Sequence, residues 1–146
     1  MTQIRRIVCP TDFSPTAARA ADFAASLAKA FGAAVTLLHV LPEMNYPLRG
    51  LGVAAAFPQL LAELRTRAHE QLQKALPTFA GIACTTELRE GAPHETILAV
   101  AKELGADLIV IGTAGHTGLA HALLGSVAER VVRLSTCPVL TVRTPA

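Results

Sequence analysis

The residues best suited to chemistry in this chain lie in a glycine-rich stretch near its C-terminus. From Gly112 to Ser126, four glycines alternate with threonine, histidine and small apolar residues, and a helix is predicted to begin at Ser126. Glycines let backbone N–H groups approach an anion closely, and the start of a helix adds N–H donors and the positive end of the helix dipole. The stretch therefore predicts a phosphate-binding loop.

A purely structural interpretation of the same residues stays open. Ser126 and Glu129 fit the Ser-x-x-Glu capping box, in which the serine only caps its helix, and the glycines could serve as turn residues. The stretch contains neither Gly-Lys-Ser/Thr nor the Gly-x-Gly-x-x-Gly spacing of common phosphate motifs. No Ser–His–acid arrangement can be argued from residue order, so Ser126 suits a phosphate donor better than a nucleophile.

A second polar group, Pro10, Thr11 and Asp12, directly follows the first predicted strand. In open α/β sheets, ligands bind outside the carboxyl ends of the strands, at the point where the strand order reverses. A phospho-receiver domain would also place acids there, but it needs an acidic cluster, and Asp12 has no second acid beside it in the sequence. The receiver interpretation is therefore disfavoured.

The histidines and cysteines predict no metal centre. No pair of histidines has the spacing of a zinc site, and His39 is expected to be a strand residue packed near the ligand pocket. The three cysteines are widely spaced and form no Cys-x-x-Cys motif. We expect them to be reduced, mostly buried thiols, which favours a reducing compartment.

Composition limits the remaining function classes. The chain has 146 residues, of which 51% are hydrophobic and 16% charged, as expected for one domain over residues 1–146 with a well-filled core. A net charge of +2, with five Phe, one Tyr and no Trp, argues against a nucleic-acid partner. No apolar run approaches the ~18 residues of a membrane span, and no signal peptide is evident. The expected location is the cytoplasm.

The elements that must position these residues alternate between strands and helices. Apolar runs predict strands over residues 4–9, 34–41, 82–88, 107–111 and 138–143. Amphipathic segments with cap signals predict helices over residues 15–31, 58–76, 93–104 and 126–134. This alternation predicts parallel βαβ units, and hence an α/β domain with an open, parallel, five-stranded sheet and helices on both faces. Segment 41–57 is predicted to be a long connection of the kind that is often functional.

On these motifs, the chain resembles the universal stress protein family. The spacing Gly112-x2-Gly115-x9-Gly125-Ser126 matches the family's ATP-binding signature Gly-2x-Gly-9x-Gly-(Ser/Thr). The resemblance covers essentially the whole chain and includes segments 7–14, 38–40, 91–93, 123–129 and 137–140. It implies a single Rossmann-like domain with strand order 3-2-1-4-5, usually a homodimer, that binds ATP in the nucleotide-binding members.

The resemblance also assigns roles to residues. Asp12 corresponds to the acid on the ribose side of the nucleotide, and the backbone of Val40 to the group that meets adenine. The complete set of predicted nucleotide-binding residues is Pro10, Thr11, Asp12, Val40, Gly112, Thr113, Gly115, His116, Gly125, Ser126 and Val127. Mg²⁺ or Mn²⁺ would accompany ATP, held mostly by phosphate oxygens and water. His116 stands where relatives often carry Arg or Lys, so the phosphate wall is expected to hold fewer permanent charges.

The implied function is that of an ATP-binding regulator of the stress response. Such a protein acts as a nucleotide-dependent switch or partner-binding module rather than by rapid turnover, and the sequence shows no obvious general base for hydrolysis. One alternative is a slow ATPase or autophosphorylating phosphotransferase. Another is a dimeric scaffold whose pocket is empty or holds a different ligand, against which the intact glycine signature argues.

The C-terminal strand is the expected site of self-association. The family implies that this strand is an edge of the sheet, and it carries no charge before Arg143. An uncharged edge is poorly protected against pairing with another strand. We therefore expect a homodimer through Val139, Leu140, Thr141 and Val142.

Overall fold

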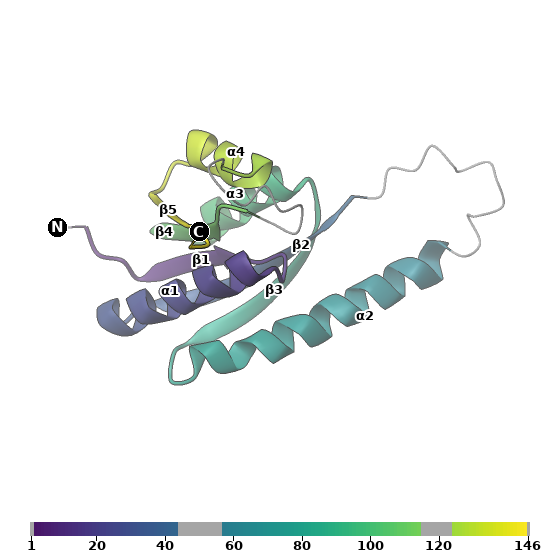
Figure 1. Ribbon diagram of the computed structural model, residues 1–146, viewed down its shortest axis with the longest axis horizontal. Helices are drawn as coiled ribbons and strands as arrows, with labels where there is room; N and C mark the ends of the chain where they lie inside the picture. The colour runs from purple at the N-terminus through teal and green to yellow at the C-terminus, as the bar shows by residue number, and fades with distance from the viewer. Residues whose placement is uncertain (1, 44–56, 115–123, 146) are drawn as a thin grey trace.

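The computed structural model describes residues 2–43, 57–114 and 124–145. Five parallel strands form one sheet in the order β3-β2-β1-β4-β5 (Figure 1). The strands are β1 (Arg6–Pro10), β2 (Ala34–Pro42), β3 (Cys84–Gly91), β4 (Leu108–Gly112) and β5 (Val139–Val142). The helices are α1 (Pro15–Phe31), α2 (Phe57–Ala75), α3 (Pro93–Leu104) and α4 (Ser126–Leu134), with a short 3-10 helix, η2 (Leu76–Phe79), after α2. The predicted α/β architecture and strand order are confirmed.

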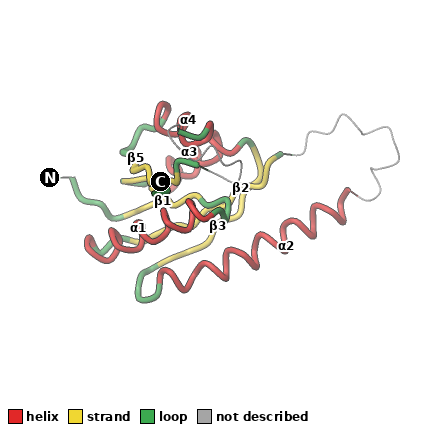
Figure 2. The backbone as a smooth tube through the Cα atoms, in the orientation of Figure 1, coloured by secondary structure: helices red, strands yellow, loops and turns green. Residues whose placement is uncertain are grey.

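Helices cover both faces of the sheet, as Figure 2 shows. On one face, α1 packs against the strands through buried alanines, and Leu72 of α2 and Phe79 of η2 complete the same core cluster. On the other face, Ile97 and Val100 of α3 and Val131 of α4 pack against Val8 and Ile109. Because the alanines are small, α1 can lie close to the backbone of the central strands, and this close packing shapes the candidate site described below.

Strand order places the point of reversal between β1 and β4. From β1 the chain passes through α1 to β2 on one side, and after β3 it crosses by way of α3 to β4 on the other side. Strands β1 and β4 are therefore neighbours, with Ile7 opposite Leu108 and Val8 opposite Ile109. Ligands bind to open α/β sheets at such a point, outside the carboxyl ends of the strands.

Local cap chemistry sets the ends of α1 and α3 where the sequence predicts them. The Ser14 hydroxyl accepts a hydrogen bond from the Ala17 N–H (3.1 Å), and Pro15 occupies the first turn. Gly32 and Gly105 end α1 and α3 in the left-handed conformation, with φ of 67° and 62°. A residue without Cβ adopts this conformation at no steric cost.

Strand β3 does not have its predicted bounds: it begins two residues later, at Cys84, and continues to Gly91. Its pairing with β2 runs without interruption from Val35–Cys84 to Pro42–Gly91. Strand β3 lies at the edge of the sheet, where charged residues such as Arg89 and Glu90 are tolerated because one side of the strand meets solvent. The predicted long connection over 41–57 falls mostly outside the described residues, apart from its first and last residues.

Asp107 joins the start of β4 to the residues that lead into β1. Its Oδ2 accepts hydrogen bonds from the backbone N–H groups of Arg5 (2.8 Å) and Arg6 (3.0 Å). These hydrogen bonds favour the ionised carboxylate and lower the pKa of Asp107 from its ordinary value of 3.8. The contact secures the β1–β4 pair at the end of the sheet opposite the candidate site.

We expect Asp107→Asn to lower the free energy of unfolding at neutral pH, because an amide oxygen is a weaker acceptor than a carboxylate. A lowered folded-state pKa stabilises the folded chain while the carboxyl is ionised. The advantage of the wild type over the variant is therefore complete above about pH 5, and it is lost as the pH falls below 3.8 through the folded pKa. Urea unfolding in a pH series measures it; a difference that does not depend on pH would contradict this assignment.

No helix in the described part of the chain is long and apolar enough to cross a membrane.

Candidate functional site

The two polar regions singled out in the sequence meet at the carboxyl ends of the neighbouring strands β1 and β4. Pro10 ends β1 and Gly112 ends β4. Strands β1 and β4 are paired neighbours, and a Cβ on Gly112 would meet Thr16 in the first turn of α1, just after the Asp12 segment. The sheet topology therefore brings the Pro10–Asp12 segment beside the first residues of the glycine-rich stretch, outside the carboxyl ends of the strands.

The segment after β1 forms a tight turn that its own side chains stabilise. Thr11 Oγ1 accepts a hydrogen bond from the Phe13 N–H (3.0 Å), and Asp12 Oδ1 accepts one from the Ser14 N–H (2.9 Å). Phe13 has a φ of 64°, in the left-handed region. That conformation costs a non-glycine residue roughly 1–2 kcal/mol. The side chain of Asp12 is exposed, and its own turn helps to orient the carboxylate.

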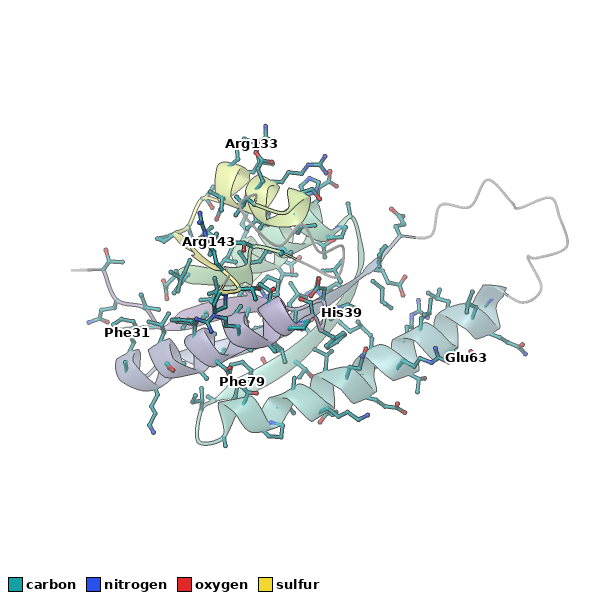
Figure 3. All side chains as sticks on the ribbon, in the orientation of Figure 1. Phe31, His39, Glu63, Phe79, Arg133 and Arg143 are labelled. Atoms are coloured by element: carbon teal, nitrogen blue, oxygen red, sulfur yellow. The ribbon has the colours of Figure 1, made fainter. Side chains whose placement is uncertain are left out.

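Strand β2 holds this turn from the neighbouring side. The Thr11 N–H donates to the Leu38 carbonyl (2.8 Å), and the Thr11 carbonyl lies 2.7 Å from Nδ1 of His39. The His39 ring also contacts Phe13, with ring centroids 4.5 Å apart. Figure 3 labels His39 near the first turn of α1. The sequence predicts only that His39 packs near the ligand pocket, because the spacing of residues does not show which backbone carbonyl a histidine ring will contact.

Val40 lies on the part of β2 that extends past the end of β1. The last β1 residue, Pro10, pairs with Leu38, so β2 has no paired residue of β1 beside Val40. The side chain of Val40 is buried among the core residues of the α3 face. Of Val40, only the backbone is therefore suited to contact a ligand beyond the end of β1.

Two glycines of the signature make close contacts within the protein. A Cβ on Gly112 would lie 2.9 Å from the Thr16 side chain and 3.1 Å from its backbone. A Cβ on Gly125 would lie 2.8 Å from the Thr113 carbonyl oxygen, which accepts a hydrogen bond from the Gly125 N–H (2.5 Å). Because Gly112 has no side chain, α1 can pack directly against the end of β4. Because Gly125 has none, the start of α4 can lie against Thr113. Gly115 and His116 lie outside the described residues.

The start of α4 differs from the capping-box prediction. The N-cap is Gly125, with φ −58° and ψ 156°, and no side chain caps the helix. The Gly125 carbonyl accepts the first helical hydrogen bond, from the Glu129 N–H (2.8 Å). Ser126 is thus one position too late to act as a cap, because the contact with Thr113 sets where the helix begins.

This arrangement suits an anion. The first turn of an α-helix leaves its N–H groups without acceptors inside the helix, and in α4 these belong to Ser126, Val127 and Ala128. Ser126 is exposed, so its hydroxyl adds a further donor. The start of α4 also lies against Thr113, which follows β4. It is therefore at the carboxyl ends of the strands, as Asp12 is.

We expect Ser126→Ala to change stability by less than about 0.5 kcal/mol, because an exposed side chain that caps nothing contributes little. If Ser126 donates to a phosphate, ATP affinity should fall about three- to tenfold, the effect of one lost hydrogen bond. Thermal unfolding and titration calorimetry on the same variant separate the two effects. A large loss of stability would restore the cap interpretation, and unchanged affinity would remove Ser126 from the site.

The described residues contain no group of three or more His, Cys, Asp or Glu side chains that could hold a metal ion. Cys9 is fully buried, and burial raises its pKa to about 12, so it stays protonated at neutral pH and is a poor nucleophile. Burial also raises the pKa of Cys84, which is half-buried on β3.

The fold and the site together define the class of protein: a doubly wound, parallel α/β domain with its candidate site at the switch point between β1 and β4. A family model described as the universal stress protein family matches residues 3–143. The chain belongs to this family. Universal stress protein MJ0531 of Methanocaldococcus jannaschii is 40% identical over 144 residues, which cover 97% of this chain and 83% of the relative.

Solved structures show the same fold. MJ0577 of M. jannaschii, whose structure was described as a structure-based assignment of biochemical function, superposes with a TM-score of 0.86 at 31% identity and covers 99% of both chains. A universal stress protein from Archaeoglobus fulgidus in complex with dAMP has a TM-score of 0.70 at 26% identity, covering 98% of this chain and 100% of its own. Another, in complex with cAMP, has a TM-score of 0.68 at 29% identity, covering 99% and 100%.

Proposed function

We propose that this protein binds ATP at the switch point between β1 and β4 and acts as a nucleotide-dependent regulator of the stress response. The observation that carries the proposal is that three features lie at the carboxyl ends of the strands, around the switch point. These are the Asp12 turn, the part of β2 at Val40 that extends past β1, and the uncapped start of α4 beside Thr113. The adenine nucleotides bound by two solved relatives support an adenine nucleotide here.

Each feature suits one part of the nucleotide. A carboxylate accepts hydrogen bonds from two hydroxyl groups, which is what the ribose presents to Asp12. The Val40 backbone offers the peptide groups that can read the adenine edge. The N–H groups of Ser126 and Val127 and the Ser126 hydroxyl would donate hydrogen bonds to phosphate oxygens. Mg²⁺ or Mn²⁺ would then be held by the triphosphate and water rather than by a cluster of protein carboxylates.

We propose regulation rather than rapid turnover because Asp12 is assigned to the ribose and the phosphate groups meet hydrogen-bond donors. In this arrangement ATP stabilises one state of the protein, and a partner reads that state. Hydrolysis would add a slow step that ends the signal.

The direct test is to purify the protein without added nucleotide, denature it, and identify any released ligand by mass spectrometry. Titration calorimetry with ATP, AMP, cAMP and adenosine then ranks the affinities, with Mg²⁺ and without it. We expect adenosine to bind and ATP to bind more tightly. A protein that releases no nucleotide and binds none of the four would contradict the proposal. Steady phosphate release well above background would favour the slow ATPase.

We further propose a homodimer formed by antiparallel pairing of β5 with its copy. Strand β5 is one of the two edge strands of the sheet. Leu140 of β5 is 36% exposed, and Val132 and Leu134 of α4 are 45% and 52% exposed. Exposed apolar side chains on and near an unprotected edge are typical of interfaces. The side chain of Val142, by contrast, is buried in the core on the α1 face, so a lysine there would disrupt folding and not only the interface.

Thr141→Pro should therefore give a folded monomer. The Pro138 carbonyl accepts a hydrogen bond from Ile109 of β4, and the Val142 carbonyl accepts one from Thr113, the residue after β4. The alternation of a strand therefore turns the backbone N–H and C=O groups of Val139 and Thr141 toward the open side of β5. Proline removes the outward N–H without breaking the β4 ladder. Sedimentation of the wild type, Thr141→Pro and the control Thr141→Val measures the mass. A wild-type monomer at high micromolar concentration, or a dimeric proline variant, would contradict this pairing.

We also propose that the chain forms one universal stress protein domain that works in the cytoplasm. The buried, protonated thiol of Cys9 is consistent with a compartment that keeps cysteines reduced.

A further inference from the structure

We propose that His39 is a positioning residue of this site, which holds the turn over residues 11–13 so that the Asp12 carboxylate is presented to the ribose. This inference rests on the proposed function for the identity of the ligand, but its structural part concerns the turn alone. Neither the glycine signature nor the predicted site contains His39.

The first observation is a hydrogen bond whose direction is fixed. His39 Nδ1 lies 2.7 Å from the Thr11 carbonyl oxygen, and a carbonyl can only accept. Nδ1 must therefore carry the proton. The Thr11 N–H already donates to the Leu38 carbonyl. Both backbone polar groups of Thr11 are thus bonded to two consecutive residues of β2.

The second observation is the strained residue beside this hydrogen bond. Phe13 has a φ of 64°, and such a conformation in an aromatic residue persists only where surrounding contacts hold it. The His39 ring lies 4.5 Å from the Phe13 ring, centroid to centroid, with the two planes tilted by 39°. Contacts between aromatic rings are stabilising, so this contact offsets part of the cost of the strained backbone. Asp12 lies between the two residues that His39 contacts.

The third observation is the rigidity of the support. Leu38 is fully buried and Val40 nearly so, and β2 is paired with β1 on one side and β3 on the other. The histidine therefore projects from a fixed strand. Because Val40 is the next residue, the same two positions of β2 set the adenine contact and, through Thr11 and Phe13, the ribose contact. His39 thus fixes the spacing between the base and sugar subsites.

Three substitutions separate the hydrogen bond from the ring. His39→Asn places an amide N–H near the position of Nδ1, whereas His39→Gln extends its amide toward the position of Nε2. His39→Phe keeps a ring beside Phe13 but has no donor. We expect Gln and Phe to bind adenosine and ATP about three- to tenfold more weakly than the wild type. Asn keeps the hydrogen bond but loses the ring contact with Phe13, and it should bind both ligands more tightly than Gln or Phe does. Wild-type affinity in folded His39→Phe would overturn the proposal.

A double-mutant cycle shows whether His39 acts through Asp12. If it does, His39→Phe should have little further effect on affinity in an Asp12→Ala background, so the two losses should not add. Full additivity would mean that His39 touches the ligand itself or acts through general stability, and the positioning role would be wrong.

Measurements without ligand keep this inference separate from the proposed function. Imidazole ¹⁵N chemical shifts of the wild type should show Nδ1 protonated, and the Ser14 amide, which donates to Asp12, should exchange faster in His39→Phe than in His39→Asn. If the wild type binds no nucleotide, the proposed function fails while these results still test the hold on the turn. An Nδ1 without a proton, or equal Ser14 exchange in both variants, would overturn it.

Discussion

Asp12→Ala is expected to weaken the binding of ATP and adenosine to the same extent, by about ten- to a hundredfold. Hydrogen bonds to a charged group contribute about 1.5–3 kcal/mol, and 1.4 kcal/mol corresponds to a tenfold change in affinity. The losses should match because the ribose is common to both ligands. Titration calorimetry of both ligands measures them.

A second substitution at Asp12 separates its contact with the ligand from its support of the turn. The Oδ1 atom of Asp12 also accepts the Ser14 N–H at the start of α1, so alanine removes a support of the turn together with the ligand contact. Asp12→Asn retains an acceptor for Ser14 and removes the charge. We expect this variant to be more stable than Asp12→Ala and still to bind both ligands several-fold more weakly than the wild type. A variant that loses ATP affinity but keeps adenosine affinity would place Asp12 near metal or phosphate.

Gly125→Val should abolish measurable ATP binding and should also destabilise the protein. The added Cβ would lie 2.8 Å from the Thr113 carbonyl oxygen, a distance that real Cβ atoms do not reach without a shift of the backbone. The start of α4 must then move away from β4, and the N–H groups of its first turn lose their position. Overpacking of this kind costs typically about 1–3 kcal/mol.

Gly32→Ala provides a matched control for lost stability. Gly32 ends α1 with a φ of 67°, and a Cβ there would meet no atom within 4 Å. Alanine at such a C-cap costs about 1 kcal/mol through backbone strain, at the opposite end of α1 from Asp12. We expect Gly32→Ala to melt earlier but bind ATP normally. If Gly125→Val bound ATP with wild-type affinity, the start of α4 would not be part of the site.

Much of the fold could be predicted because its signals are local. Ser14 before Pro15, and Gly32 and Gly105 after apolar helices, act through bonds that span a few residues, so their positions in the sequence were sufficient. The apolar residues Leu108 to Ile111 identified a buried strand for the same reason. The switch point could also be predicted, since alternating strands and helices leave few topologies and the family resemblance selects one of them.

Contacts between distant residues could not be predicted in this way. Ser126 fits a capping box by its spacing, but Gly125 is the N-cap, and its N–H donates to the carbonyl of Thr113, which lies twelve residues before Gly125. Val142 was expected at an interface because the edge strand carries no charge, yet its side chain lies in the core beneath α1. The face that each residue of a short edge strand presents depends on what packs against it.

The sequence by itself determined the family, the order of elements and the two segments that meet at the sheet edge, because periodicity, caps and glycine spacing are properties of neighbouring residues. Only the tertiary structure decided how those segments are held. The His39 ring reaches the Thr11 carbonyl across 28 positions of the chain, Phe13 keeps a left-handed backbone, and Gly112 leaves room for Thr16 of α1. Each of these depends on how strands and helices that are distant in sequence pack together, because burial and steric exclusion are determined by which atoms are close in space.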